Sequence, residues 1–102
     1  MLQYIHSHFT ENISLEQLSD LTFCTKSYLA RLFKKYMDIS ILNYIHRLRI
    51  EKAVSYLKEG KMTIQEIAEA VGYQNLNNFY KYFKQEKGET PAVFLQNWKR
   101  QK

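Results

Sequence analysis

The sequence predicts an all-α fold, and three observations lead to that prediction. The 102 residues include only three Gly and one Pro, and no segment shows the strict alternation of apolar and polar residues that is typical of strands. The run 41–59 contains neither Gly nor Pro and has apolar residues at helical spacing. A pattern of helix caps and apolar residues also occurs twice, so helices joined by short turns account for the chain.

Three shorter helices are predicted before the long one. The segment Leu2–Phe9 has apolar residues at helical spacing. Ser14 and Gln17 have the spacing of a capping box, which predicts a helix to about Leu21. After a turn, a further helix is expected over Ser27–Met37. Its predicted buried residues are Leu29, Leu32, Phe33 and Tyr36.

The segment Ile41–Glu59 is predicted to form one long helix, with Ser40 as its cap and Gly60 at its end. At about 100° per residue its apolar residues fall on two faces. One face carries Ile41, Tyr44, Ile45 and Leu48, and the roughly opposite face carries Ile50, Ala53, Val54 and Leu57. The two halves of the helix are therefore expected to pack against different partners. The helix is about 28 Å long at about 1.5 Å per residue.

The pattern of the first forty residues returns after the long helix. The segment 63–67 matches 14–18 at an offset of 49, and Phe83 matches Phe33 at an offset of 50. The extra residue falls in the turn around Gly72. Thr90-Pro91 then repeats Ser40-Ile41 as the cap and first position of a last helix. Two copies of helix, turn and helix are the arrangement of paired helix-turn-helix motifs.

Charge placement indicates a polyanionic partner. The net charge is +5 and the sequence pI is about 9.3. In each copy the first helix is acidic and the second is basic. The residues projected away from the core are Ser27, Ala30, Arg31 and Lys34 in the first copy, and Asn77, Tyr80, Lys81 and Lys84 in the second. Arg, Asn and Ala suit base edges in a major groove, whereas Lys neutralises phosphate. An ordinary solvated face is the alternative for any one residue, and the recurrence in two copies favours DNA.

Several separated motifs also carry a resemblance to a known family. In the second copy they are 64–68, 71–73, 78–79, 83–84, Gly88 and Thr90-Pro91, and in the first copy they are Leu29, 33–35, Tyr44 and 49–53. Together they resemble the DNA-binding domain of the AraC-type (AraC/XylS) transcription regulators. Asp38 departs from the family pattern at a position that usually holds a helix-ending glycine, and Leu95 and Ala30 each replace a residue that is often polar or basic.

The resemblance implies seven helices that place two recognition helices in successive major grooves of double-stranded DNA. It implies one DNA-binding module over residues 1–102, with helix-turn-helix subdomains at 1–40 and 61–102 and a linker helix at 41–60. The base-contacting positions of the family fall on Ser27, Ala30, Arg31, Asn77, Asn78 and Lys81. Family members also imply an upstream effector or receiver domain and, for an activator, contact with RNA polymerase.

Phosphate contacts are expected from two lysines and from the amino ends of helices, where unpaired backbone amides attract anions. These candidates are Lys34, Lys84, Thr25, Thr63 and Thr90. The main alternative is a basic helical adaptor that binds partner helices or an acidic protein.

Catalysis is not expected, because no nucleophile, base and orienting group assemble in the sequence. Cys24 lies in a turn beside Phe23, which suggests packing, and His46 shares a helix face with Leu42 and Arg49, which suggests a surface or DNA-backbone role. No metal site or cofactor is expected. The absence of a long apolar run or a signal peptide predicts a soluble, cytoplasmic protein.

Overall fold

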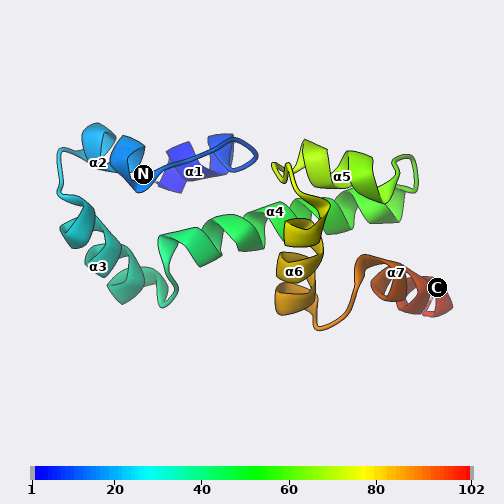
Figure 1. Cartoon of the computed structure of the whole chain (residues 1–102). Helices are drawn as coiled ribbons and strands as arrows, with labels where there is room; N and C mark the ends of the chain where they lie inside the picture. Colours follow the sequence, from blue (N-terminus) through cyan, green and yellow to red (C-terminus); the bar gives the residue numbers. More distant parts are fainter. Residues whose placement is uncertain (1, 102) are drawn as a thin grey trace.

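The structure is a computed structural model, and it describes residues 2–101. This part of the chain forms seven helices and no strand (Figure 1), which confirms the predicted all-α class. The helices are α1 (Leu2–His8), α2 (Leu15–Thr22), α3 (Lys26–Met37), α4 (Ile41–Glu59), α5 (Ile64–Ala70), α6 (Leu76–Lys87) and α7 (Pro91–Arg100). None of the seven is long and apolar enough to cross a membrane.

Local side-chain hydrogen bonds start the helices where the sequence predicts. The hydroxyl of Ser14 accepts from the backbone N–H of Gln17, whose side chain accepts in return from the Ser14 N–H, so the capping box is confirmed. Thr63 and Glu66 form the same arrangement at α5. At the end of α3, Asp38 adopts the left-handed conformation with φ 61°, as expected of the residue that stands in place of glycine.

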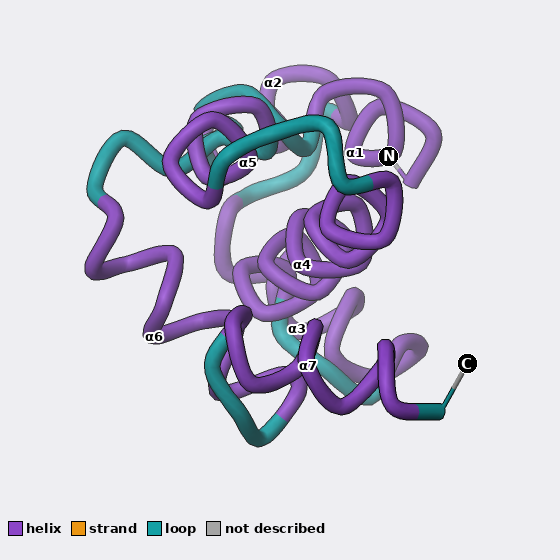
Figure 2. The backbone as a smooth tube through the Cα atoms, turned by 90° about the vertical axis from the view of Figure 1, so that its right-hand side faces the viewer, coloured by secondary structure: helices purple, strands orange, loops and turns teal. Residues whose placement is uncertain are grey.

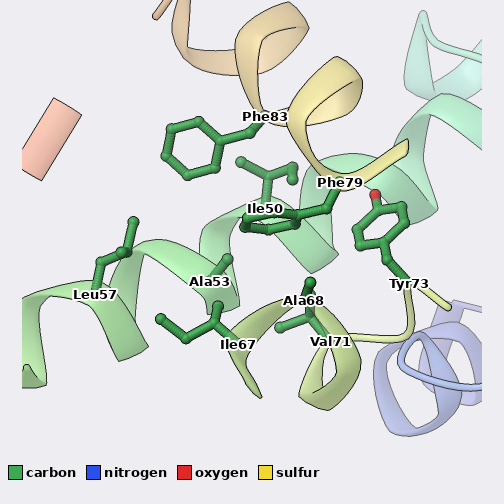
Figure 3. Close-up of a cluster of buried hydrophobic side chains, with 9 residues drawn as sticks. All are labelled: Ile50, Ala53, Leu57, Ile67, Ala68, Val71, Tyr73, Phe79 and Phe83. Carbon is green, nitrogen blue, oxygen red and sulfur yellow. The ribbon is translucent and has the colours of Figure 1, made fainter. Parts of the chain in front are cut away.

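The long helix α4 lies at the centre, and Figure 2 shows it nearly end-on with the other helices around it. Its two apolar faces hold two separate clusters of buried side chains, as predicted. The N-terminal cluster consists of Ile5, Leu18, Leu29, Phe33, Ile41 and Ile45. The C-terminal cluster, drawn in Figure 3, consists of Ile50, Ala53, Leu57, Ile67, Ala68, Val71, Tyr73, Phe79 and Phe83. The molecule is accordingly elongated, with extents of 47 × 23 × 22 Å.

One predicted core residue of α3 is on the surface. Tyr36 is 74% exposed, whereas Leu29 and Phe33 are each 2% exposed. Met37 packs against the N-terminal cluster in the position one turn after Phe33, and Tyr36 is rotated away from it. The prediction for Tyr36 was wrong because neighbouring apolar residues at helical spacing competed for one inward position. Leu32 is half-buried.

Candidate nucleic-acid interface

The first candidate face lies on α3. Thr25 caps this helix, and its hydroxyl accepts from the backbone N–H of Tyr28 at 3.2 Å. Leu29 and Phe33 fix the opposite side of the helix in the N-terminal cluster. The three predicted base-contacting residues, Ser27, Ala30 and Arg31, are all exposed. The buried apolar pair thus orients α3 so that these side chains point into solvent.

The second candidate face lies on α6 and is built in the same way. The side chain of Asn75 accepts from the backbone N–H groups of Asn77 and Asn78 at 2.8 and 3.4 Å. Phe79 is completely buried, while Asn77, Asn78 and Lys81 are exposed. The sequence analysis predicted no cap for this helix. Asn75, directly before the first apolar residue Leu76, could have predicted it.

Both faces carry mainly positive charge. Within α3 the charged residues are all cationic, and the only acidic residue of α6, Glu86, lies 3.5 Å from the Arg47 guanidinium of α4. The first helix of each unit is acidic, with Glu16 and Asp20 on α2 and Glu66 and Glu69 on α5. Each unit therefore presents positive charge on its second helix. In Figure 1, α3 lies near the N-terminal end of α4 and α6 crosses α4 further along, and both run from the top towards the bottom of the view.

The five predicted phosphate-contacting residues are all exposed. Lys34 and Lys84 occupy matching places in the last turns of α3 and α6. Thr25 and Thr90 cap helices with no acidic residue in the first turn, which leaves the positive helix end available to an anion. Thr63 differs from both. Its backbone N–H donates to the Glu66 carboxylate at 2.9 Å, and this bond lowers the pKa of Glu66, so a negative charge already lies at that end.

His46 occupies a different place from the one the sequence suggested. It is 6% exposed, its Nδ1 lies 2.6 Å from the Tyr73 hydroxyl, and its ring stacks on Tyr82 with centroids 3.5 Å apart. The surface role was wrong because the turn after α5 and the body of α6 cover this side of α4. The ring of Tyr82 that stacks on His46 also contacts Lys81 of the candidate face, whose Nζ lies 5.4 Å from the Tyr82 ring centroid.

Buried His46 predicts a loss of stability in mild acid. Burial, with the positive charges of Arg49 and Lys81, lowers the pKa of His46 from 6.5 to about 4. The unfolded chain therefore binds more protons than the folded chain between these values, and stability present at neutral pH is lost as the pH falls through this range. We expect the free energy of unfolding to drop by about 1.4 kcal/mol per pH unit, or roughly 3 kcal/mol in all.

Urea unfolding between pH 7 and 4.5 measures this effect. His46→Gln should flatten the dependence above pH 5, whereas His8→Gln, on the short helix α1, should keep it. Equal slopes for the parent chain and His46→Gln contradict the assignment.

The turn between α2 and α3 also differs from expectation. Phe23 is 97% exposed and lies outside the core. Cys24 is half-buried, and its thiol donates to the Thr22 carbonyl oxygen at 3.4 Å. Phe23 has φ 58°, and the position that matches it at an offset of 49 is Gly72, with φ 106°. The two copies therefore need a left-handed residue at one equivalent point in each turn, and only the second uses glycine there.

Two exposed basic faces on paired helix-turn-helix units define the class of a DNA-binding domain. Residues 2–101 contain no group of three or more His, Cys, Asp or Glu side chains that could hold a metal ion.

Comparison with known proteins agrees with this class. Residues 18–97 match the family model described as a helix-turn-helix domain. The chain is 37% identical to the bifunctional transcriptional activator/DNA repair enzyme AdaA of Bacillus subtilis, over 92% of the chain and 44% of AdaA. It is similar to the C-terminal domain of AraT, a response regulator from Geobacillus stearothermophilus, with 32% identity and a TM-score of 0.87 over 93% of the chain and 79% of that structure.

A third similarity extends to the fold alone. The DNA-binding domain of the global transcriptional factor AdpA, solved in complex with a target DNA, has a TM-score of 0.89 at 17% identity, over 99% of the chain and 91% of that structure. The chain belongs to the AraC-type family of helix-turn-helix DNA-binding transcription regulators. It spans less than half the length of AdaA.

Proposed function

We propose that the chain binds a specific double-stranded DNA sequence by placing α3 and α6 in successive major grooves, as the DNA-binding module of a transcription regulator. The observation that carries the proposal is the recurrence of one exposed, basic face on two helices whose opposite sides are fixed in separate cores. A linker helix of about 28 Å approximates the roughly 34 Å repeat of the major groove. The proposed parts are the units 1–40 and 61–102 and the linker 41–60.

Base contacts are assigned to the exposed residues of the two faces: Ser27, Ala30, Arg31, Asn77, Asn78 and Lys81. Arg31 suits a bidentate contact with guanine, and the two asparagines suit adenine. Ala30 has no hydrogen-bonding group and suits a thymine methyl. The side chains of Asn77 and Asn78 are exposed, while their backbone N–H groups donate to Asn75.

Phosphate contacts are assigned to Lys34, Lys84, Thr25, Thr63 and Thr90. The ends of α3 and α7 fit this role through their helix termini as well as their hydroxyls. At α5 the carboxylate of Glu66 takes the Thr63 N–H, so the hydroxyl is the group of Thr63 that remains to meet a phosphate.

We propose that the module acts by binding DNA and not by catalysis, and that it does so in the cytoplasm. AraT is named as a response regulator and its similar part is C-terminal, which supports an effector or receiver domain as the partner that controls this module. Contact with RNA polymerase is proposed if the regulator is an activator.

Two substitutions separate the two kinds of contact. Arg31→Ala should cost roughly 1–3 kcal/mol on the preferred duplex and relax discrimination at one base pair, because it removes a base contact. Lys84→Ala should weaken all duplexes to a similar degree, because phosphate contacts carry no sequence information. The measurement is affinity for a duplex selected from a random pool with the parent chain and for a scrambled duplex of equal length.

Lys35→Ala serves as the matched control, since it removes an exposed positive charge from the same helix as Arg31 without removing an assigned contact. The residue assignment fails if Arg31→Ala weakens the selected and scrambled duplexes equally.

A further inference from the structure

Arg49 is a buried cation in the middle of α4, only 7% exposed. Its Nε–H donates to the Phe9 carbonyl oxygen at 2.6 Å, and its terminal nitrogen donates to the Glu11 carbonyl oxygen at 2.8 Å. Both acceptors lie in the turn between α1 and α2. The guanidinium therefore holds this turn of the N-terminal half against the central helix.

The same guanidinium also meets the C-terminal half. Its central carbon lies 5.1 Å from the centroid of the Tyr73 ring, in the turn between α5 and α6. A Cβ placed on Gly72 would lie 2.5 Å from the Thr10 carbonyl oxygen and 3.1 Å from that same guanidinium carbon. The two turns therefore lie against each other with Arg49 between them, and Figure 1 shows the turn after α1 beside the turn after α5.

These contacts form a junction, defined here as Arg49, Gly72 and Tyr73 with the α1–α2 turn. The two apolar clusters do not merge across it. The contacts between the halves are instead polar and aromatic, and include the bond of His46 to Tyr73. Apolar burial tolerates sliding because it has no direction, whereas two hydrogen bonds from one planar guanidinium fix an orientation.

We propose that Arg49 is a positioning residue that sets the relative orientation of α3 and α6, so that both recognition faces meet one duplex at a fixed spacing. The inference rests on the proposed function. It adds that α4 does not hold the spacing alone, because the buried Arg49 locks the α1–α2 turn and the α5–α6 turn to each other. Glycine at position 72 is required by the same junction, because any side chain there collides with the Thr10 backbone.

Distances between spin labels in the free protein test the lock directly. In a Cys24→Ser background, Asp20→Cys and Gln65→Cys place one label on an exposed site of α2 and one on α5. The parent pair should give one narrow distance distribution. Arg49→Met should broaden it while circular dichroism stays helical, and Lys52→Met, which removes an exposed charge from the same helix, should leave it narrow.

DNA binding provides the second readout. On a full duplex selected with the parent chain, Arg49→Met should lose about tenfold in affinity, because the binding-competent orientation becomes a minor population. Affinity for a duplex with one half-site should not change. The preference for the selected spacing over duplexes with one or two base pairs added between the half-sites should also weaken. A residue that only stabilised the fold would instead lower full-site and half-site binding together.

Arg49→Lys is a milder variant that keeps the charge and one donor nitrogen. It should broaden the distance distribution less than Arg49→Met does, and it takes the place of Arg49→Met if that variant does not fold. A broad distribution in the parent, or parent-like distributions and spacing preferences in both variants, overturns the inference. If the parent binds no duplex the proposed function fails, and the label distances still decide whether Arg49 locks the halves.

Discussion

The affinity of this chain for duplex DNA is expected to fall steeply as the salt concentration rises. If about five to eight phosphates are neutralised, the slope of log K against log salt should be about −4 to −7. Between 50 and 200 mM salt this corresponds to a loss of about 10² to 10⁴-fold. The physical reason is release of counterions from DNA by the exposed lysines and arginines of the two faces.

Fluorescence anisotropy with a labelled duplex measures this slope at several salt concentrations. Lys84→Ala should reduce its magnitude by about one, because one phosphate contact is lost. Glu69→Gln on the acidic helix α5 provides a control that changes charge away from the assigned contacts. A slope near zero contradicts DNA binding through these faces and favours a basic adaptor for helices or acidic proteins.

The sequence predicted those parts of the fold that depend on neighbouring residues. Ser14 with Gln17 forms the expected capping box, and Asp38 takes the expected left-handed conformation. Both follow from bonds or dihedral angles within a few residues. The opposed faces of α4 could be predicted as well, because helical periodicity is a property of one segment.

The parts that could not be predicted depend on contacts between distant segments. Arg49 is bonded to residues about 40 positions away, and His46 to a residue 27 positions away. In a helical projection both read as polar residues on a solvated face. The docking of the α1–α2 turn, the α5–α6 turn and α6 against α4 makes that face an interior. The sequence motif at 49–53 includes Arg49, but a local motif does not show that its guanidinium binds a turn about 40 residues away.

The same distinction between local and long-range contacts applies to the candidate site. The exposed faces of α3 and α6 could be predicted, since burial of Leu29 and Phe79 determines which residues point outward. The orientation of one face relative to the other could not, because it depends on the junction and on the length of α4.

The length of α4 is expected to fix the spacing between α3 and α6. One alanine inserted after Glu51 should reduce affinity for the full duplex by about 10² to 10⁴-fold, towards the affinity that remains when one recognition helix is disabled. The insertion turns everything beyond it by about 100° and lengthens the axis by about 1.5 Å. It falls between Ile45 and Leu48, which pack in the N-terminal half, and Val54 and Leu57, which pack in the C-terminal half.

The structure adds a second consequence of this insertion. His46 and Arg49 precede the insertion point, whereas their partners Tyr73 and Tyr82 follow it, so the junction is separated as well. The insertion also separates Ile50 from the other members of the C-terminal cluster. The variant should therefore unfold more easily than the parent but remain helical by circular dichroism, because the N-terminal cluster and the rest of the C-terminal cluster each stay on one side of the insertion. Glu51→Ala, which changes the same exposed site without adding a residue, should bind like the parent. Parent-like affinity of the folded insertion variant for the full duplex, measured beside Glu51→Ala and a half-site duplex, contradicts simultaneous binding by α3 and α6 and leaves one helix as the only one engaged.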